Sequence, residues 1–392
     1  MPPTQPPVAA AVRRRVPPWV WAVLAGANVT YGVVQSTGPQ RALDLQTMSY
    51  WTGDWLLNGV DLYRSLPGPD YPPHAIVALS PLALLPPRGV LVIWACINMA
   101  LLAAAPVLAA RFANRRAAAA DIVLLALMFV CWSGAKMLLQ FTLLTLVLGL
   151  AAVLIADRRP VWSGVCLGFA LMKPHVTAPF LLWTLFSRRW RIAVVAAASI
   201  AAGTLVYCLR VHASPVDVAV NYASGLGLLY GGAHAMAGAS ELRPLLASLA
   251  QPPALDVVSV IAAAALLGVV CAVAAREIGA AGGVKYAAPA LAGVWSLIAF
   301  YNLTYGFVIL LPAAALLLLD DDAATARPRL AALAVLQIGL MVDLPGLSRR
   351  VKAIAPAFAP FDAALAHADR LLMFAQFGAL VALGTFHVRH RG

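Results

Sequence analysis

Charge is scarce in this chain. Of its 392 residues only 11% are charged, and Asp and Glu together number 16. Average soluble domains carry roughly 25% charged residues. Hydrophobic residues make up 62% of the chain, and the mean hydropathy is +0.84. This balance excludes an ordinary soluble domain and predicts a polytopic membrane protein.

Cysteine pairs and the common catalytic motifs are also missing. The five cysteines stand singly inside apolar runs and no C-x-x-C occurs, so the sequence gives no sign of a disulfide framework or a zinc site. The chain contains no G-x-x-x-x-G-K-[ST], G-x-G-x-x-G, H-E-x-x-H or G-x-S-x-G. Nucleotide hydrolysis, dinucleotide redox chemistry, zincin proteolysis and nucleophile-elbow hydrolysis therefore have no motif support.

The net charge of +12 does not indicate nucleic acid as a partner, because the basic residues cluster at the ends of apolar runs. That placement is typical of cytoplasmic topology determinants and of contacts with anionic membrane lipids. The clusters are Arg13–Arg15, Arg111 with Arg115 and Arg116, Arg158 and Arg159, Arg188 with Arg189 and Arg191, Arg327 and Arg329, and Arg389 and Arg391. They predict a cytoplasmic N-terminus and extracytoplasmic segments at 38–87 and 212–253. Arg349, Arg350 and Lys352 disagree: either this topology is in error there, or they form a basic patch for a lipid phosphate.

Apolar runs of about 20 residues predict an all-α transmembrane helical bundle of about ten spans. The predicted spans are 19–37, 88–110, 119–137, 138–156, 191–211, 254–275, 284–301, 303–319, 329–345 and 365–386. Residues 161–187 lie between two arginine clusters and are interrupted by Lys173-Pro174-His175, which predicts a broken or re-entrant pair of half-helices. We expect a disordered cytoplasmic tail at 1–18 and one membrane domain at 19–392.

The segment 38–87 concentrates carboxylates and aromatic rings. It holds Asp44, Asp54, Asp61 and Asp70 among Tyr50, Trp51, Trp55, Tyr63 and Tyr71. Such a segment suits a site that handles a sugar, with one carboxylate acting as a base. Asp44 begins a predicted amphipathic helix, where the alternative role is charge complementarity with the helix start. Asp54 and Asp61 fit solvated structural acids better.

Lys173 is the most informative cation. A lysine at membrane depth costs on the order of 3 kcal/mol, so it faces a cavity or a partner, or it snorkels to the interface. An anionic lipid phosphate would satisfy Lys173 together with His175.

Gln140 is a candidate ligand or simply a helix-end hydrogen bonder. The turn Tyr301–Tyr305 is a candidate site or part of an aromatic belt.

In order along the chain, these motifs resemble glycosyltransferase family 87, a branch of the GT-C membrane glycosyltransferases. The matching motifs are Asp44 after the first span, Gly59-Val60-Asp61-Leu62-Tyr63, Tyr71-Pro72-Pro73, Pro81-Leu82-Ala83-Leu84-Leu85-Pro86, Gln140, Gly164 and Gly168 with Lys173, and Tyr301–Tyr305 before Leu310-Leu311-Pro312. The chain departs from the family pattern at Leu139 and Thr142, which replace Gly and Asn, at Pro174, where the proline has moved closer to the lysine, and at Gly306, where many members have an acidic residue or His.

The resemblance implies a GT-C-like fold and an integral enzyme of the cell membrane whose active site faces the extracytoplasmic side. It would transfer a sugar, most commonly mannose in this family, from a polyprenyl-phosphate donor to a glycolipid or glycan acceptor with inversion. Asp44 would be the general base, and Lys173 with His175 would bind the donor phosphate. The residues Tyr63, Tyr71, Gln140, Tyr301, Asn302 and Tyr305 would contact the substrates. With a cation already at the leaving phosphate, we expect no metal and no other cofactor.

Two other functions remain open from the sequence. A transporter or lipid flippase also explains a membrane-buried lysine and a broken helix, but it predicts duplicated halves, which the sequence does not show. A non-catalytic assembly partner of an envelope enzyme is the other possibility. Activity separates all three.

Overall fold

The computed structural model describes residues 8–36, 43–65, 68–113, 116–137, 140–233, 254–281, 287–299, 304–319 and 326–341, with single positions at 375, 378 and 381. Every regular element in these ranges is helical, which confirms the predicted all-α membrane fold. Within these ranges, three stretches are long and apolar enough to cross a membrane: α5 (Pro87–Ala113), α10 (Trp190–Val211) and Val257–Arg276 within α13 (Ala254–Ala281).

The N-terminal tail differs from the prediction. Instead of disorder throughout 1–18, the structure has a helix, α1 (Val8–Arg15). Val8, Ala9 and Val12 are buried on its apolar face, and Arg13 forms an ion pair of 3.1 Å with Asp121. An eight-residue helix is too short to be stable alone. It forms here because α15 (Leu311–Leu319) and α16 (Ala326–Met341) pack against its apolar face.

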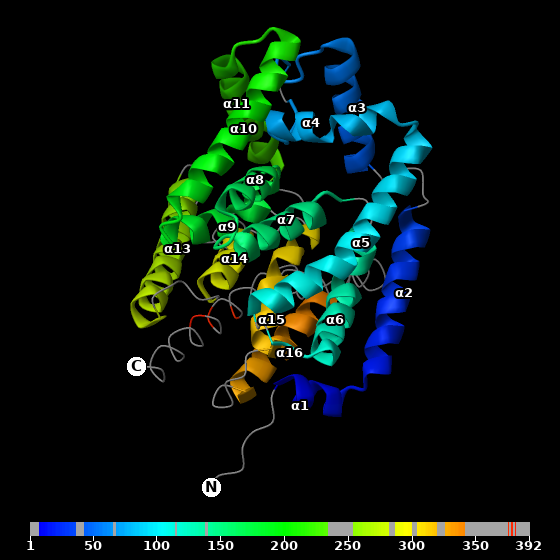
Figure 1. The fold of residues 1–392 in the computed structure, drawn as a ribbon, viewed down its shortest axis with the longest axis vertical. Coiled ribbons are helices and arrows are strands. Elements are labelled where there is room, and N and C mark those ends of the chain that lie inside the picture. The colour runs from blue at the N-terminus through cyan, green and yellow to red at the C-terminus, as the bar shows by residue number, and fades with distance from the viewer. Residues whose placement is uncertain are drawn as a thin grey trace.

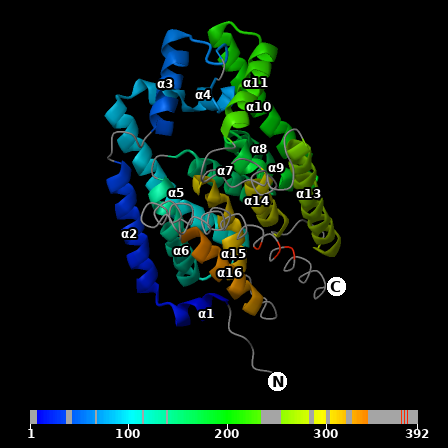
Figure 2. The ribbon, with the colours of Figure 1, turned by 180° about the vertical axis from the view of Figure 1, so that it is seen from behind.

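From α1 the chain crosses to the opposite end of the molecule through α2 (Pro18–Ser36), which packs along α6 (Ala119–Met137) (Figure 1). At that far end lie α3 (Leu43–Asn58), α4 (Pro73–Leu79) and α11 (Pro215–Ala233) (Figures 1 and 2). The 3-10 helix η1 (Ser80–Leu84) follows α4 directly and packs against α3. Both predicted extracytoplasmic segments are thus partly helical.

Three consecutive helices are too short to span a bilayer. The helices α7 (Thr142–Ile155), α8 (Pro160–Ala170) and α9 (Pro174–Phe186) are each roughly 16–21 Å long, against a hydrocarbon thickness of about 30 Å. A break between α8 and α9 is present as predicted, but it falls at 171–173, and Pro174 and His175 are the first two residues of α9.

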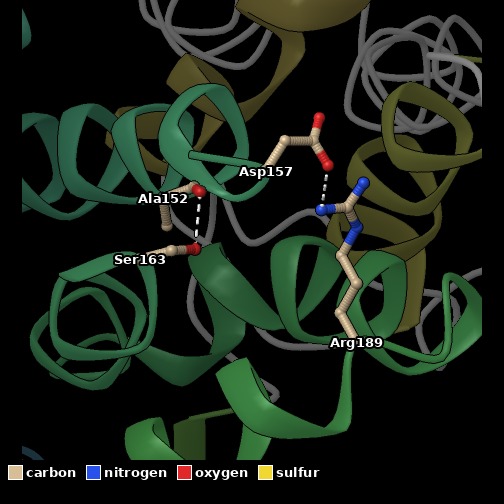
Figure 3. A network of polar contacts seen from close by, with 4 residues as sticks. All are labelled: Ala152, Asp157, Ser163 and Arg189. Atoms are coloured by element: carbon tan, nitrogen blue, oxygen red, sulfur yellow. Dashed lines mark hydrogen bonds and ion pairs between the residues drawn. The ribbon is translucent and has the colours of Figure 1, made fainter. Parts of the chain in front are cut away.

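The ends of these three helices meet in two places. Arg189, after α9, pairs with Asp157, between α7 and α8, at 2.6 Å (Figure 3). Near this pair the Ser163 hydroxyl donates to the Ala152 carbonyl at 2.6 Å. At the other end of the same helices Lys173 contacts Thr142. The chain therefore runs away from Lys173 in α7, back in α8 and away again in α9, which brings the two arginine-rich turns to one end.

The long helix α10 packs beside α8 through two glycines. A Cβ on Gly164 would lie 2.5 Å from the Val195 Cβ, and a Cβ on Gly168 would lie 2.8 Å from the Ser199 Cβ. Small residues four apart let helices approach closely in a membrane. Gly164 and Gly168, two of the residues that carry the family resemblance, are thus packing residues. They place the end of α8, and the break after it, beside α10.

Buried side chains form two clusters. The membrane cluster joins α1, α2, α5 to α10, α13, α14 (Ala287–Ala299), η2 (Thr304–Leu310), α15 and α16. The cap cluster consists of Leu45, Met48, Trp55, Leu62, Tyr63, Tyr71, Ala75, Ile76, Leu79, Leu82, Val90, Trp94, Phe141, Met172, Tyr207, Cys208 and Val218. The predicted spans 284–301, 303–319 and 329–345 correspond to α14, η2 with α15, and α16. The predicted span 365–386, apart from three positions, lies outside the described residues.

Candidate functional site

Lys173 lies at the border of the two clusters, at the N-cap of α9, and only 4% of its surface is exposed. Its ammonium donates a hydrogen bond of 3.2 Å to the hydroxyl of Thr142, the first residue of α7. The same ammonium lies 5.2 Å from the centre of the Tyr71 ring. Both of these groups are neutral.

Two helix starts add to this positive charge. The α7 helix begins at Thr142 and the α9 helix begins at Pro174, and both beginnings lie at Lys173. A helix N-terminus carries a partial positive charge and free N–H groups, so it favours an anion. His175, half-buried, is the second residue of α9. Lys173 and His175, which the resemblance assigns to a donor phosphate, therefore both lie at the start of α9.

Tyr71 forms one wall beside Lys173 and is held from two sides. Its ring packs edge-on against Phe141, with ring centres 5.8 Å apart. Its carbonyl accepts a hydrogen bond of 2.6 Å from the Tyr63 hydroxyl. Burial raises the pKa of Tyr63 well above its usual range, so this hydroxyl keeps its proton and remains a donor. Tyr63 therefore lies behind Tyr71, fully buried, and fixes its backbone.

Tyr207, which the sequence did not single out, organises the cap. Its hydroxyl accepts a hydrogen bond of 2.8 Å from the Leu62 N–H and donates one of 3.1 Å to the Asp61 carboxylate. The Trp55 indole stacks on its ring and donates to its carbonyl at 3.3 Å. Asp61 also accepts from the Tyr63 N–H at 3.2 Å. Asp61 is therefore a structural acid, in line with its sequence interpretation, and Tyr207 ties this turn to α10.

Asp44 is the second residue of α3, and its side chain lies outside the described part of the structure. The next turn of the helix is placed: Leu45 and Met48 are fully buried in the cap cluster. That cluster also contains Tyr71 and Met172, the residue before Lys173. The start of α3 and the Lys173 region therefore share one buried core.

The remaining candidates are less well defined. Gln140 is half-buried, and its carbonyl accepts a hydrogen bond of 3.4 Å from the Trp94 indole. Tyr301 and Asn302 lie outside the described residues. Tyr305 falls in η2, but its side chain is not described. The basic residues at 349, 350 and 352 also lie outside the described residues. In the ranges that the structure describes, no group of three His, Cys, Asp or Glu side chains has the placement of a metal site.

A family model, Glycosyltransferase family 87, matches residues 70–298, which is more than half of the chain. The match contains Tyr71, Gln140, Lys173 and His175, whereas Asp44 precedes it. No curated protein and no solved structure matches the chain.

Proposed function

Because the chain belongs to glycosyltransferase family 87 and is a membrane protein, we propose that it takes its sugar from a polyprenyl-phosphate donor. The protein is a glycosyltransferase; the donor, the acceptor and the residue roles are the proposal. The sugar is mannose, and the acceptor is a glycolipid or glycan on the extracytoplasmic side of the cell membrane.

The observation that carries this proposal is the set of groups around the Lys173 ammonium. A buried ammonium, the Thr142 hydroxyl and the starts of α7 and α9 converge on one point. Preorganised positive groups in a site shielded from water stabilise developing negative charge strongly. A lipid phosphate that leaves the sugar gains such charge, and His175 is near enough in the chain to assist. Entry of the phosphate displaces the Tyr71 ring or the Thr142 hydroxyl from the ammonium.

The transfer needs a base as well as a stabilised leaving group. In a single displacement the acceptor oxygen bonds to the anomeric carbon while the bond from that carbon to the phosphate oxygen breaks. The acceptor proton passes to the Asp44 carboxylate, and the electron pair leaves with the polyprenyl phosphate. The family resemblance points to Asp44 as the base, and Asp54 and Asp61 already accept structural hydrogen bonds, from Asn58 and Tyr207 respectively.

Transfer can be tested with the full-length protein in nanodiscs, given radiolabelled polyprenyl-phosphate-mannose and a membrane glycolipid extract. Asp44→Asn keeps the size of the side chain and removes the base. Asp54→Asn, ten residues along α3, is the matched control. We expect transfer by the wild type and by Asp54→Asn, and a loss of at least about 100-fold in Asp44→Asn, the scale of general base catalysis.

The possible outcomes separate the parts of the proposal. Equal transfer by Asp44→Asn and wild type would remove Asp44 from the mechanism and leave the donor assignment standing. No transfer with this donor, but transfer with another lipid-linked sugar, would overturn mannose alone. Failure with every polyprenyl-phosphate sugar would overturn the donor class.

A further inference from the structure

A second candidate site lies at the other end of the molecule, beside the N-terminal helix. A cavity of about 480 Å³ is lined by residues of α1, α2, α6 and α16. These elements gather near the N-terminus in Figure 1, away from the cap helices α3 and α4. The volume falls in the range of natural ligand sites, roughly 300–1,000 Å³. This cavity plays no part in the proposed transfer reaction.

The lining of the cavity combines two cations with an apolar wall. Arg15 at the end of α1 and Arg327 at the start of α16 both line it. Apolar side chains of α1, α2, α6 and α16 and of the residue after α1 line most of the rest, among them Val16, Met128 and Leu330. A soluble anion would use the arginines but leave the apolar wall unmatched. A neutral acyl chain would use the wall but leave the arginines unmatched. An amphiphile with a negative head matches both.

We propose that this cavity binds an anionic phospholipid of the cytoplasmic leaflet. Its phosphate lies between Arg15 and Arg327, and one acyl chain lies along Val16, Met128 and Leu330. Charge complementarity selects the head, and guanidinium groups suit phosphate because they donate paired hydrogen bonds. The arginine cluster at 13–15 marks this end as cytoplasmic, where anionic lipids are concentrated. Because the two arginines come from different elements, the lipid joins α1 to α16 and stabilises the packed tail.

The test measures lipid retained by the full-length protein. Protein in detergent is titrated with phosphatidylglycerol or with phosphatidylcholine of the same acyl chains, and bound lipid is counted by native mass spectrometry. Thermal unfolding is followed in parallel. We expect one phosphatidylglycerol per chain, bound more tightly than phosphatidylcholine, and a rise in the unfolding temperature. Soluble glycerol phosphate, the head without the chains, should give neither effect.

Charge variants locate the head. Arg15→Ala and Arg327→Ala should each weaken phosphatidylglycerol binding about fivefold, the usual effect of one basic residue near a lipid surface, and the double variant should weaken it about 25-fold. Arg14→Ala removes the same charge from the same helix but from a residue that does not line the cavity. It should bind as the wild type does. An equal loss in Arg14→Ala would show general surface attraction and overturn the proposal.

A substitution that fills the cavity tests where the acyl chain lies without changing the charge. Ala334 lines the cavity, whereas its neighbour Val335 does not and is 38% exposed. Ala334→Phe should reduce phosphatidylglycerol binding at least fivefold, and Val335→Phe should leave it unchanged. Unaltered binding in Ala334→Phe would place the lipid elsewhere. Equal affinity for phosphatidylcholine and phosphatidylglycerol in the wild type would overturn the anionic head.

Discussion

The cap cluster and the membrane cluster are both buried, yet different interactions hold them together. In the cap, tryptophan and tyrosine side chains reach backbone groups far away in sequence: Trp55 and Leu62 both bond to Tyr207, 152 and 145 residues along the chain. In the membrane cluster, helices touch where a residue is small: Gly149 lies against the Phe180 ring, and Gly164 against Val195. The cap thus concentrates its directional bonds on Tyr207, whereas the membrane cluster combines close approach at glycines with side-chain bonds such as the one from Gln337 to the Met128 carbonyl.

Lipid gives helices no hydrophobic reason to associate, so van der Waals packing and interhelical hydrogen bonds have to supply the attraction in a membrane. In the cap cluster the short helices α4 and η1 are marginal alone and need long-range contacts to fix them. Lys173 lies between the two clusters: its helix, α9, packs in the membrane cluster, while Tyr71, whose ring its ammonium contacts, belongs to the cap cluster.

The largest expected effect on activity comes from a substitution at Lys173, between the two clusters. Lys173→Met keeps the length of the side chain and removes the charge. We expect transfer activity to fall about 100- to 1000-fold, the usual loss when one charge-stabilising group is removed. The unfolding temperature should stay the same or rise, because a buried charge is costly. Thr142→Val, which removes only a partner of the ammonium, is the control and should lose much less activity. Comparable activity in Lys173→Met and wild type would refute the leaving-group role.

Acid should weaken the packing of α4. His74, on α4, is buried, and burial lowers its pKa to about 4 from an ordinary value of 6.5. Between these values the unfolded chain takes up a proton that the folded chain refuses. Stability is therefore complete above pH 6.5 and declines by about 3 kcal/mol as the pH falls to 4. Unfolding of the wild type and His74→Gln at several pH values measures this. The same acid sensitivity in His74→Gln would exclude this histidine as the cause.

Adding one methyl group should separate close from open helix contacts. Gly164→Ala places a Cβ 2.5 Å from the Val195 Cβ, so α8 and α10 have to move apart, at a cost of about 2 kcal/mol. Gly26→Ala on α2 meets nothing within 4 Å and should be neutral or stabilising by up to about 1 kcal/mol. Thermal unfolding in detergent compares the two. If both variants unfold alike, close approach does not hold the membrane cluster together.

Removing one hydroxyl tests the bonds of the cap. Tyr207→Phe keeps the ring that stacks on Trp55 and removes the group that bonds Leu62 and Asp61. We expect a loss of about 1–2 kcal/mol, because the buried Leu62 N–H is left without this acceptor. Protease cleavage should rise in the 43–72 segment and stay unchanged in α8 to α10. Tyr222→Phe is a control, since its hydroxyl makes a longer bond of 3.4 Å to the Asp70 carbonyl at an exposed position. Equal losses would mean that the Tyr207 bonds have no special weight.

The smallest effect belongs to the ion pair that closes the short helices. Asp157 is mostly exposed, so Asp157→Asn should cost less than about 1 kcal/mol. A measured loss above about 2 kcal/mol would show that the pair, rather than the packing around Gly164, keeps the two turns together.

Much of the helical frame could be predicted, because apolar runs bounded by arginine or proline define spans. The predicted spans 119–137 and 191–211 agree with α6 and α10 to within one residue. The break at Lys173 was also predictable, since Pro174 cannot continue a preceding helix. α1 was missed because its apolar stripe is only three buried residues long and depends on α15, α16 and Asp121 for stability.

The site was predictable in part for the same reason. Lys173 and His175 stand out because cations are rare in apolar segments, and Asp44 stands out in an acidic one. Tyr207 did not, because a tyrosine in an apolar run has no local signal and its partners are about 145 residues away. α11 was likewise missed inside the segment 212–253, where the glycines and alanines that follow Pro215 give no strong period.

The length of α10 has a mechanical consequence. Its 22 residues form a rod of roughly 33 Å, which starts next to the Asp157–Arg189 pair and carries Tyr207 and Arg210 near its other end. The Arg210 guanidinium donates hydrogen bonds to the carbonyls of Leu56 and Leu57 at the end of α3. A tilt of one degree about the lower end displaces the upper end by about 0.6 Å. Tyr207 and Arg210 therefore couple the position of α3 and of the turn at 61–63 to the tilt of α10.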